Sequence, residues 1–171
     1  MQTEKSGLDK LAFVVASGLG LGFIPVGPGT FGSLLGLGIA ALIVFRFRFS
    51  PDLMWPALLA AAMATFVIGV WAASRVERFL GKKDAQLIVI DEVCGQVLTF
   101  ASLAPLMGRL GGAWRWAMVA GFLLFRVFDI FKPFPIRRLE AIPSGAGVMA
   151  DDVGAGIYAA VVLFVIFYFL Y

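Results

Sequence analysis

The sequence predicts an all-α membrane protein, a polytopic helical bundle of about four to five spans with an additional short N-terminal apolar helix. Two observations support this prediction. Hydrophobic residues make up 61% of the 171 residues and charged residues only 15%, whereas soluble domains carry about 25% charged residues. The apolar residues also gather in runs close to the ~20 residues that cross a bilayer. The length fits a single membrane-embedded domain over residues 1–171.

Composition excludes several kinds of chemistry. The single cysteine, Cys94, rules out an intrachain disulfide. The absence of histidine from the sequence removes every mechanism that depends on imidazole. The net charge of +3 suits an anionic membrane surface. Nucleic acid is not an expected partner, because the sequence has no stripe of Lys and Arg interleaved with aromatic residues.

The first apolar segment, residues 11–24, is rich in glycine and too short for a confident span. It predicts a membrane-associated or re-entrant helix. A signal-peptide core is the alternative, although no clear small-x-small cleavage site follows it. The next residues, PVGPGTFGS at 25–33, contain a Pro-Gly turn signal, and Thr30 or Ser33 is expected to cap the helix that follows.

Five further apolar runs are the candidate spans, and polar or glycine-rich segments separate them. The runs cover residues 30–45, 54–73, 93–107, 114–128 and 153–171. The third is short for a full crossing. A basic loop that includes Arg75 and Arg78 precedes it, and a long polar loop over residues 129–152 precedes the last run. Tyr168 and Tyr171 fit an interfacial position at the end of that run.

The distribution of cations predicts the orientation. Five crossings place most of the basic residues on one side: Lys5, Lys10, Arg75, Arg78, Lys82, Lys83, Arg126, Lys132, Arg137 and Arg138. The other side receives Arg46, Arg48, Arg109 and Arg115. By the positive-inside rule the first side is cytoplasmic.

Carboxylates gather at the ends of apolar segments on that same side. Five of the eleven acidic residues lie there: Asp91, Glu92, Asp129, Asp151 and Asp152. An ionised side chain in hydrocarbon costs several kcal/mol, about 3 by the lower estimates, so these acids predict a bound cation, salt bridges or a wet cavity. Without histidine or cysteine partners, they suit a hard cation such as Mg²⁺, which prefers oxygen ligands and often shares its coordination shell with substrate phosphates.

Basic residues beside these acids favour a phosphate ligand. Arg126 and Lys132 flank Asp129, and Arg137 and Arg138 follow; such cations stabilise charge on a transferring phosphoryl group. The turn around residues 27–33 offers backbone amides at a helix start, where anions bind. Its Gly-x4-Gly pattern is followed by Ser rather than Lys, so a nucleotide site is not expected.

Each feature also has a purely structural explanation. Asp151 and Asp152 could cap a helix. Asp91 and Glu92 could be a solvated helix start. Arg126, Asp129 and Lys132 have the i, i+3 spacing of helical salt bridges, and the Pro-Gly segment could be a plain turn. To account for the whole pattern, all of these structural explanations would have to be true at once, in three loops on one membrane face.

Four blocks of the sequence resemble one known family, phosphatidylglycerophosphatase A. They are GFIPVGPGTFGSL at 22–34, DEVCGQ at 91–96, FRVFDIFKPFPI at 125–136 and GAGVMADDVGAG at 145–156. The resemblance extends from about Gly18 to Gly156, and four blocks in the same order are highly specific. Ser144 and Ala150 depart from the usual pattern, and neither is a charged position.

The resemblance implies an all-helical, Mg²⁺-dependent lipid phosphatase of the bacterial inner membrane, with its active site facing the cytoplasm. It implies hydrolysis of the terminal phosphomonoester of phosphatidylglycerophosphate to phosphatidylglycerol and phosphate, with membrane lipids as the partners. On this hypothesis one pool of acids holds Mg²⁺ and activates water: Asp91, Glu92, Asp129, Asp151 and Asp152. The sequence does not separate metal ligand from general base within that pool.

The same hypothesis assigns the remaining polar residues. Lys132 and Arg126 would hold the leaving phosphate, and Arg137 and Arg138 the phosphodiester of the lipid. The helix-start residues that would assist in binding phosphate are Gly29, Thr30, Gly32 and Ser33. Two alternatives are an ion or lipid transporter with a carboxylate cation site, and a phosphatidyl transferase. The acids lie at one face rather than through the bilayer, which disfavours a transport pathway, and the paired Asp-x3-Asp motif expected of the transferase is absent from the sequence.

Overall fold

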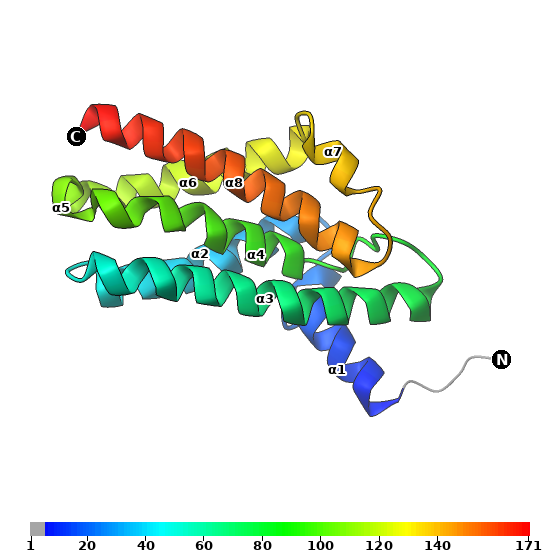
Figure 1. The fold of residues 1–171 in the computed structure, drawn as a ribbon. Coiled ribbons are helices and arrows are strands. Elements are labelled where there is room, and N and C mark those ends of the chain that lie inside the picture. Colours follow the sequence, from blue (N-terminus) through cyan, green and yellow to red (C-terminus); the bar gives the residue numbers. More distant parts are fainter. Residues whose placement is uncertain (1–5) are drawn as a thin grey trace.

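The computed structural model describes residues 6–171, and within that range the ordered elements are helices without a strand (Figure 1). Lys5, which the sequence assigns to the cytoplasmic side, lies outside the described residues. The longer helices are α1 (Gly7–Ala16), α2 (Pro28–Phe47), α3 (Pro51–Leu80), α4 (Ile90–Thr99), α6 (Trp114–Phe131) and α8 (Gly145–Leu170). The shorter ones are η1 (Leu21–Phe23), η2 (Phe100–Leu106), α5 (Met107–Leu110), η3 (Gly111–Ala113) and α7 (Ile136–Leu139).

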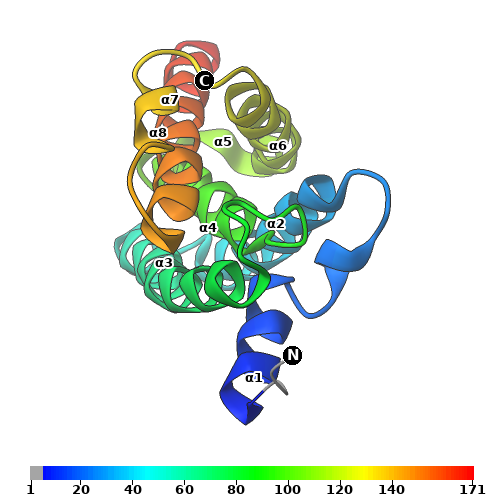
Figure 2. The same ribbon diagram turned by 90° about the vertical axis from the view of Figure 1, so that its right-hand side faces the viewer.

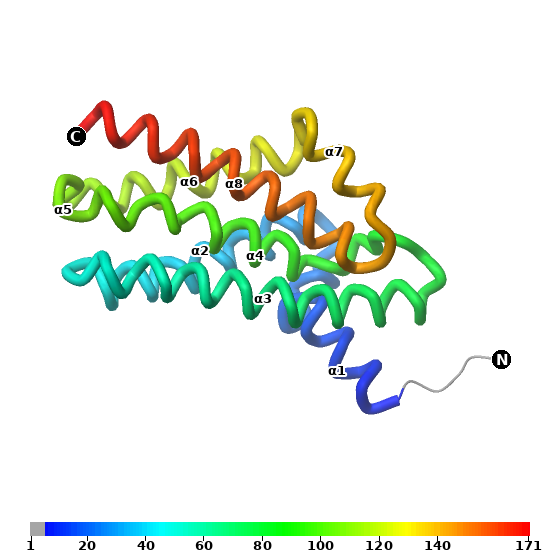
Figure 3. The backbone as a smooth tube through the Cα atoms, in the orientation of Figure 1, coloured from blue at the N-terminus to red at the C-terminus, as the bar shows by residue number. Residues whose placement is uncertain are grey.

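Four stretches within residues 6–171 are long and apolar enough to cross a membrane. They are Pro28–Phe47, Pro51–Leu80, Ile90–Phe131 and Gly145–Leu170. The third stretch reverses direction at α5, so that α4 with η2 leads to one end of the bundle and α6 returns (Figures 1 and 3). The predicted all-α membrane bundle of four to five spans is therefore confirmed.

Helix α4 lies at the centre of the bundle. It packs against α2, α3, α6 and α8, which surround it in the end-on view (Figure 2). The stretch that contains it is mostly buried, whereas only a minority of residues in the other three are buried. Glycines allow its close contact with α8, because a Cβ added to Gly156 would lie 2.5 Å from the carbonyl oxygen of Gly95. The packing at the centre of the bundle therefore depends on direct backbone contact between α4 and α8 as well as on apolar side chains.

Helix α1 is the short N-terminal helix that the sequence predicts, but it ends at Ala16 and does not extend through residue 24. Its buried residues pack against α3. Ser6 and Asp9 form a capping box, and Asp9 Oδ1 lies 2.7 Å from Arg75 Nε. The hydrogen bonds that Asp9 accepts from Ser6 and then from Arg75 lower its pKa to about 2. These contacts attach the start of α1 to the last turns of α3.

Three predicted boundaries are wrong. Helix α3 continues to Leu80, so Arg75 and Arg78 lie on a helix and not in a loop. Helix α8 begins at Gly145 rather than at residue 153, and the loop predicted over residues 129–152 is shorter and contains α7. The reason is common to all three: hydropathy marks the apolar part of a helix, whereas backbone hydrogen bonds continue through polar residues that remain helical.

The start of α2 also differs from the prediction. Gly27 is the N-cap, with a left-handed φ of 63°, and Pro28 is the first helical residue. Proline suits that position, because its fixed φ is helical and the missing N–H has no intrahelical acceptor there. Thr30 and Ser33, the expected caps, lie inside the helix, and Ser33 donates its hydroxyl to the carbonyl oxygen of Gly29 at 2.9 Å.

Candidate active site

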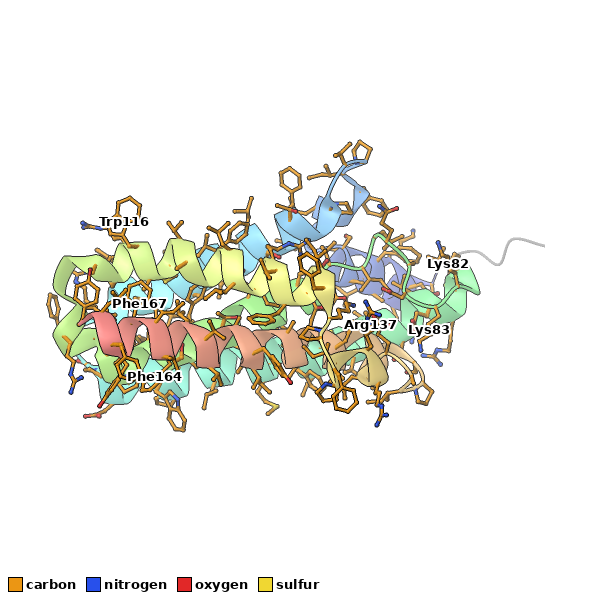
Figure 4. All side chains as sticks on the ribbon, turned by 90° about the horizontal axis from the view of Figure 1, so that it is seen from above. Lys82, Lys83, Trp116, Arg137, Phe164 and Phe167 are labelled. Carbon is orange, nitrogen blue, oxygen red and sulfur yellow. The ribbon has the colours of Figure 1, made fainter. Side chains whose placement is uncertain are left out.

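The five predicted acidic residues line one cavity. It lies at the end of the bundle where α2, α4 and α8 begin and where α3 and α6 end (Figure 1). Lys82, Lys83 and Arg137 lie at this end, and Trp116, Phe164 and Phe167 lie toward the other (Figure 4). The cavity has a volume of about 370 Å³. It is lined by Gly27, Pro28, Gly29, Asp84, Gln86, Ile88, Asp91, Glu92, Arg126, Asp129, Lys132, Asp151 and Asp152.

Three carboxylates form the inner part of this cavity. Asp91 and Glu92 lie in the first turn of α4, and Asp152 lies in the second turn of α8. One oxygen from each lies within 4.8 Å of the other two. Asp91 is 8% exposed and Asp152 only 2%. We refer to these three residues as the acidic cluster.

The acidic cluster fits a divalent cation. Asp91 Oδ1, Glu92 Oε2 and Asp152 Oδ2 are buried, and none of them has a hydrogen-bond partner among residues 6–171. Buried carboxylates without donors are strongly unfavourable unless a positive charge compensates them. Oxygen ligands from carboxylates, with room for water and for a phosphate, are what Mg²⁺ requires. The donor set therefore agrees with the predicted ion.

Lys132 supplies positive charge on one wall. It is the C-cap of α6, and its Nζ donates a hydrogen bond to Asp151 and lies 3.0 Å from Glu140 Oε1. Burial alone would lower the pKa of Lys132, but the hydrogen bonds and charges of Asp151 and Glu140 outweigh burial and raise that pKa above its usual value. The ammonium group therefore stays protonated at physiological pH.

Arg126 supplies positive charge on another wall. Its Nη1 donates to Asp129 Oδ2 at 2.6 Å and to Ser33 Oγ at 3.2 Å, which joins α6 to α2. Gly29 lies beside it, since a Cβ added there would be 2.1 Å from Glu92 Oε1 and 3.4 Å from Arg126 Nη1. The start of α2 therefore touches both the acidic cluster and the arginine.

The structure brings some predicted phosphate-binding residues into the cavity and leaves others outside it. Gly29 lines the cavity, but Thr30, Gly32 and Ser33 are not among its lining residues. The Thr30 amide already donates to the Gly27 carbonyl at 2.9 Å. Arg137 and Arg138, on α7, are exposed and also lie outside the lining. The Arg138 guanidinium instead lies over the Phe134 ring, 4.7 Å from its centroid.

Sequence reasoning missed the loop between α3 and α4. Asp84, Gln86 and Ile88 line the cavity from this loop. Asp84 has a left-handed φ of 47°, and its amide donates to Glu77 Oε1 at 2.8 Å. The charge of Asp84, shortly before Asp91, is the one sequence signal that could have indicated this residue. Gln86 and Ile88 belong to no motif that the sequence analysis identified.

The structure contradicts some of the purely structural explanations for these charged residues and supports others. Ser144 is the N-cap of α8, and Asp151 and Asp152 lie in the second turn, so helix capping by this pair is wrong. Asp91 and Glu92 do begin a helix, but Asp91 is buried and Glu92 is only partly exposed, so this helix start is not freely solvated. The i, i+3 ion pair between Arg126 and Asp129 is present. Lys132 instead pairs with Asp151 and Glu140.

The chain is similar to known proteins of one family. Residues 14–167 match the family model of phosphatidylglycerophosphatase A. Two proteins named "Phosphatidylglycerophosphatase A" are similar: the Haemophilus influenzae protein is 35% identical over 174 residues, with 98% of this chain and 99% of that one covered. The Escherichia coli protein is 33% identical over 154 residues, with coverage of 90% and 81%.

A third relative carries a different name. A Bacteroides thetaiotaomicron protein named "Putative phosphatidylinositol-3-phosphatase" is 36% identical over 153 residues, with 90% of this chain and 91% of that one covered. No solved structure matches the chain. The family match spans all four sequence blocks and every residue of the acidic cluster. The chain therefore belongs to the phosphatidylglycerophosphatase A family and is a phosphatase.

Proposed function

We propose that this chain hydrolyses the terminal phosphomonoester of phosphatidylglycerophosphate in an Mg²⁺-dependent reaction. The products are phosphatidylglycerol and inorganic phosphate, in the biosynthesis of phospholipids. One membrane-embedded domain over residues 1–171 carries this activity at the cytoplasmic face of the bacterial inner membrane. The observation that supports the proposal most is the convergence of the acidic cluster, Arg126 and Lys132 on one cavity at a helix-bundle end.

The residues have distinct proposed roles. Asp91, Glu92 and Asp152 would hold Mg²⁺, which when bound supplies positive charge next to phosphate oxygens. Arg126 and Lys132 hold and neutralise the remaining phosphate oxygens. Asp129 and Asp151 were predicted from the sequence as further metal ligands. Because they contact Arg126 and Lys132, we assign them to orienting these two cations.

Hydrolysis then needs a water, a base and a leaving group. A carboxylate of the cavity accepts a proton as water attacks phosphorus, and the bond between phosphorus and the glycerol oxygen breaks. The glycerol oxygen takes up a proton from solvent water and leaves as the alcohol, and the protonated carboxyl group returns its proton to solvent. Gly29 at the start of α2 allows the phosphate to approach the helix N-terminus, where the peptide dipoles favour negative charge.

A transporter is the alternative that the sequence left open. The acidic residues that line the cavity gather at one end of the bundle, and the opposite end carries Trp116, Phe164 and Phe167 (Figure 4). This distribution supports a reaction at one membrane face rather than a path through the bilayer. The relative named for phosphatidylinositol 3-phosphate supports a lipid phosphomonoester as the substrate class, and that lipid is the natural competitor in a test.

Purified protein in lipid nanodiscs tests the proposal. Release of inorganic phosphate is measured from phosphatidylglycerophosphate and from phosphatidylinositol 3-phosphate, each with Mg²⁺. We expect kcat/KM to be at least tenfold higher for phosphatidylglycerophosphate. A preference for the inositol lipid would overturn the substrate, and phosphate release from neither lipid would overturn the activity.

Lys132→Ala is expected to reduce kcat more severely than Arg138→Ala. Lys132 lies inside the cavity, where it stabilises charge that grows in the transition state. Arg138 is exposed and outside the lining, so that its proposed contact with the phosphodiester should appear mainly in KM. Steady-state kinetics of both variants measure the difference. The reverse ranking would show that the two phosphates are assigned to the wrong cations.

The loops around the site are expected to face the cytoplasm, because the cationic excess lies there. Single cysteines at Lys82→Cys and Arg138→Cys, in a Cys94→Ala background, can be labelled with an impermeant thiol reagent. Arg48→Cys, at the opposite end, is the control. In intact cells with a permeabilised outer membrane we expect label on the control alone. Labelling of positions 82 and 138, with position 48 protected, would show that the protein has the opposite orientation in the membrane.

A further inference from the structure

Gln96 is a buried polar residue to which the proposed reaction assigns no role. It lies on α4 and has no exposed surface. Neither Oε1 nor Nε2 has a hydrogen-bond partner among the described residues. Buried amides nearly always bond to protein or to ordered water, so this side chain indicates a partner that residues 6–171 do not supply.

The position of Gln96 points to the acidic cluster. It follows Glu92 by four residues and therefore lies on the same face of α4, one turn deeper in the bundle. Both residues face α2 across glycines: a Cβ added to Gly36 would lie 2.9 Å from Gln96 Cβ, and one added to Gly32 would lie 3.3 Å from Glu92 Cβ. Long side chains on a helix lean toward its N-terminus, which directs Gln96 toward Glu92.

A neighbouring residue shows how a buried polar group on this helix is otherwise satisfied. Thr99, also fully buried on α4, donates its hydroxyl to the Gly95 carbonyl oxygen at 2.9 Å. Gln96 makes no such bond within residues 6–171. An apolar side chain of equal size would fill its position without an unpaired amide, so packing does not account for glutamine here.

We propose that Gln96 is a positioning residue of the cation site. Its amide would hold an ordered water beside Glu92, and this water would be available to a cation bound by the acidic cluster. Buried waters typically make about three hydrogen bonds to groups that would otherwise be unpaired, and Mg²⁺ usually keeps several of its waters. The unpartnered Glu92 Oε2 and the two polar atoms of Gln96 supply such groups. This inference rests on the cation site of the proposed function.

The test compares wild type with Gln96→Met, which keeps the length and removes both polar atoms. The shift in Tm on titration with Mg²⁺ alone measures cation binding, and kinetics with saturating Mg²⁺ give kcat and KM. Residues that orient the ligands of a metal typically change affinity or activity by about 10- to 100-fold. We expect Gln96→Met to need at least tenfold more Mg²⁺ for half of the Tm shift. Its kcat should fall while KM for the lipid stays unchanged, and its metal-free Tm should rise.

Two further variants sharpen this test. Gln96→Glu keeps the length and a polar head, and should recover most of the Mg²⁺ response that Gln96→Met loses. Thr99→Val removes a satisfied hydroxyl from the same helix, and should lower the metal-free Tm without changing the Mg²⁺ concentration required. An unchanged Mg²⁺ response in Gln96→Met overturns the role of Gln96 and leaves the proposed function intact. A wild-type protein that shows no Mg²⁺ response overturns the cation site, and the role of Gln96 with it.

Discussion

Asp152→Asn is expected to abolish phosphate release and to leave the protein folded. Asp152 is almost fully buried, and its Oδ2 has no partner among the described residues. The amide keeps the shape but removes a charge that the cation requires. Loss of such a ligand should cost several kcal/mol of transition-state stabilisation, which corresponds to a fall in kcat of at least about 10³-fold.

The same change should leave the metal-free protein at least as stable as wild type. Asp91, Glu92 and Asp152 crowd one buried space, and removing one carboxylate relieves repulsion among them. Thermal unfolding in the presence of a chelator measures this effect. Asp52→Asn, on an exposed position at the first turn of α3, is the matched control and should change neither property. Normal turnover in Asp152→Asn would remove this residue from the cation site.

Gly29→Ala is expected to lower kcat by about 100-fold or more, although it adds a single methyl group. The new Cβ would lie 2.1 Å from Glu92 Oε1, so the carboxylate has to move. That oxygen is the end of a flexible side chain, and its movement should disturb the site while the fold survives. Displacement of a reacting group by about 1 Å can cost 10²-fold in rate.

Gly38→Ala, on the same helix, separates this effect from a general effect of alanine. A Cβ at Gly38 meets nothing within 4 Å among the described atoms. Alanine should therefore stabilise α2 by at most about 1 kcal/mol and leave activity unchanged. Kinetics and thermal unfolding of both variants provide the comparison. Equal activity in the two variants would mean that the start of α2 does not constrain Glu92 during the reaction.

Hydropathy predicted the class of fold and the apolar centres of the helices, but not their ends. Because Asp151 and Asp152 are charged, the sequence predicted that the polar loop extends to residue 152, yet both residues lie on α8. Charge marks where a span stops being apolar, whereas a helix begins where the backbone first becomes helical, here directly after Ser144. Arg75 and Arg78 on α3 show the same effect at the other end of a long helix.

The sequence predicted that charged residues gather at the candidate site, but it left open which of them form ion pairs with one another. The gathering of the five acids followed from topology, because alternate helix ends share one face. Three of the acids lie together as the acidic cluster, and the other two pair with Arg126 and Lys132. This division depends on the packing of side chains from different helices, which no local sequence pattern predicts. Asp84 and Gln86 enter the cavity from a loop, where no periodicity relates residue number to direction.

On the proposed function, Asp91, Glu92 and Asp152 hold one divalent cation beside Arg126 and Lys132. A crystal structure of the protein with Mn²⁺ in place of Mg²⁺ tests it directly, since the anomalous scattering of manganese locates the ion without reference to the protein. We expect an anomalous peak that all three carboxylates contact, and its loss in Asp152→Asn. A peak away from these three residues, or full turnover by the wild type in excess chelator, would contradict the claim.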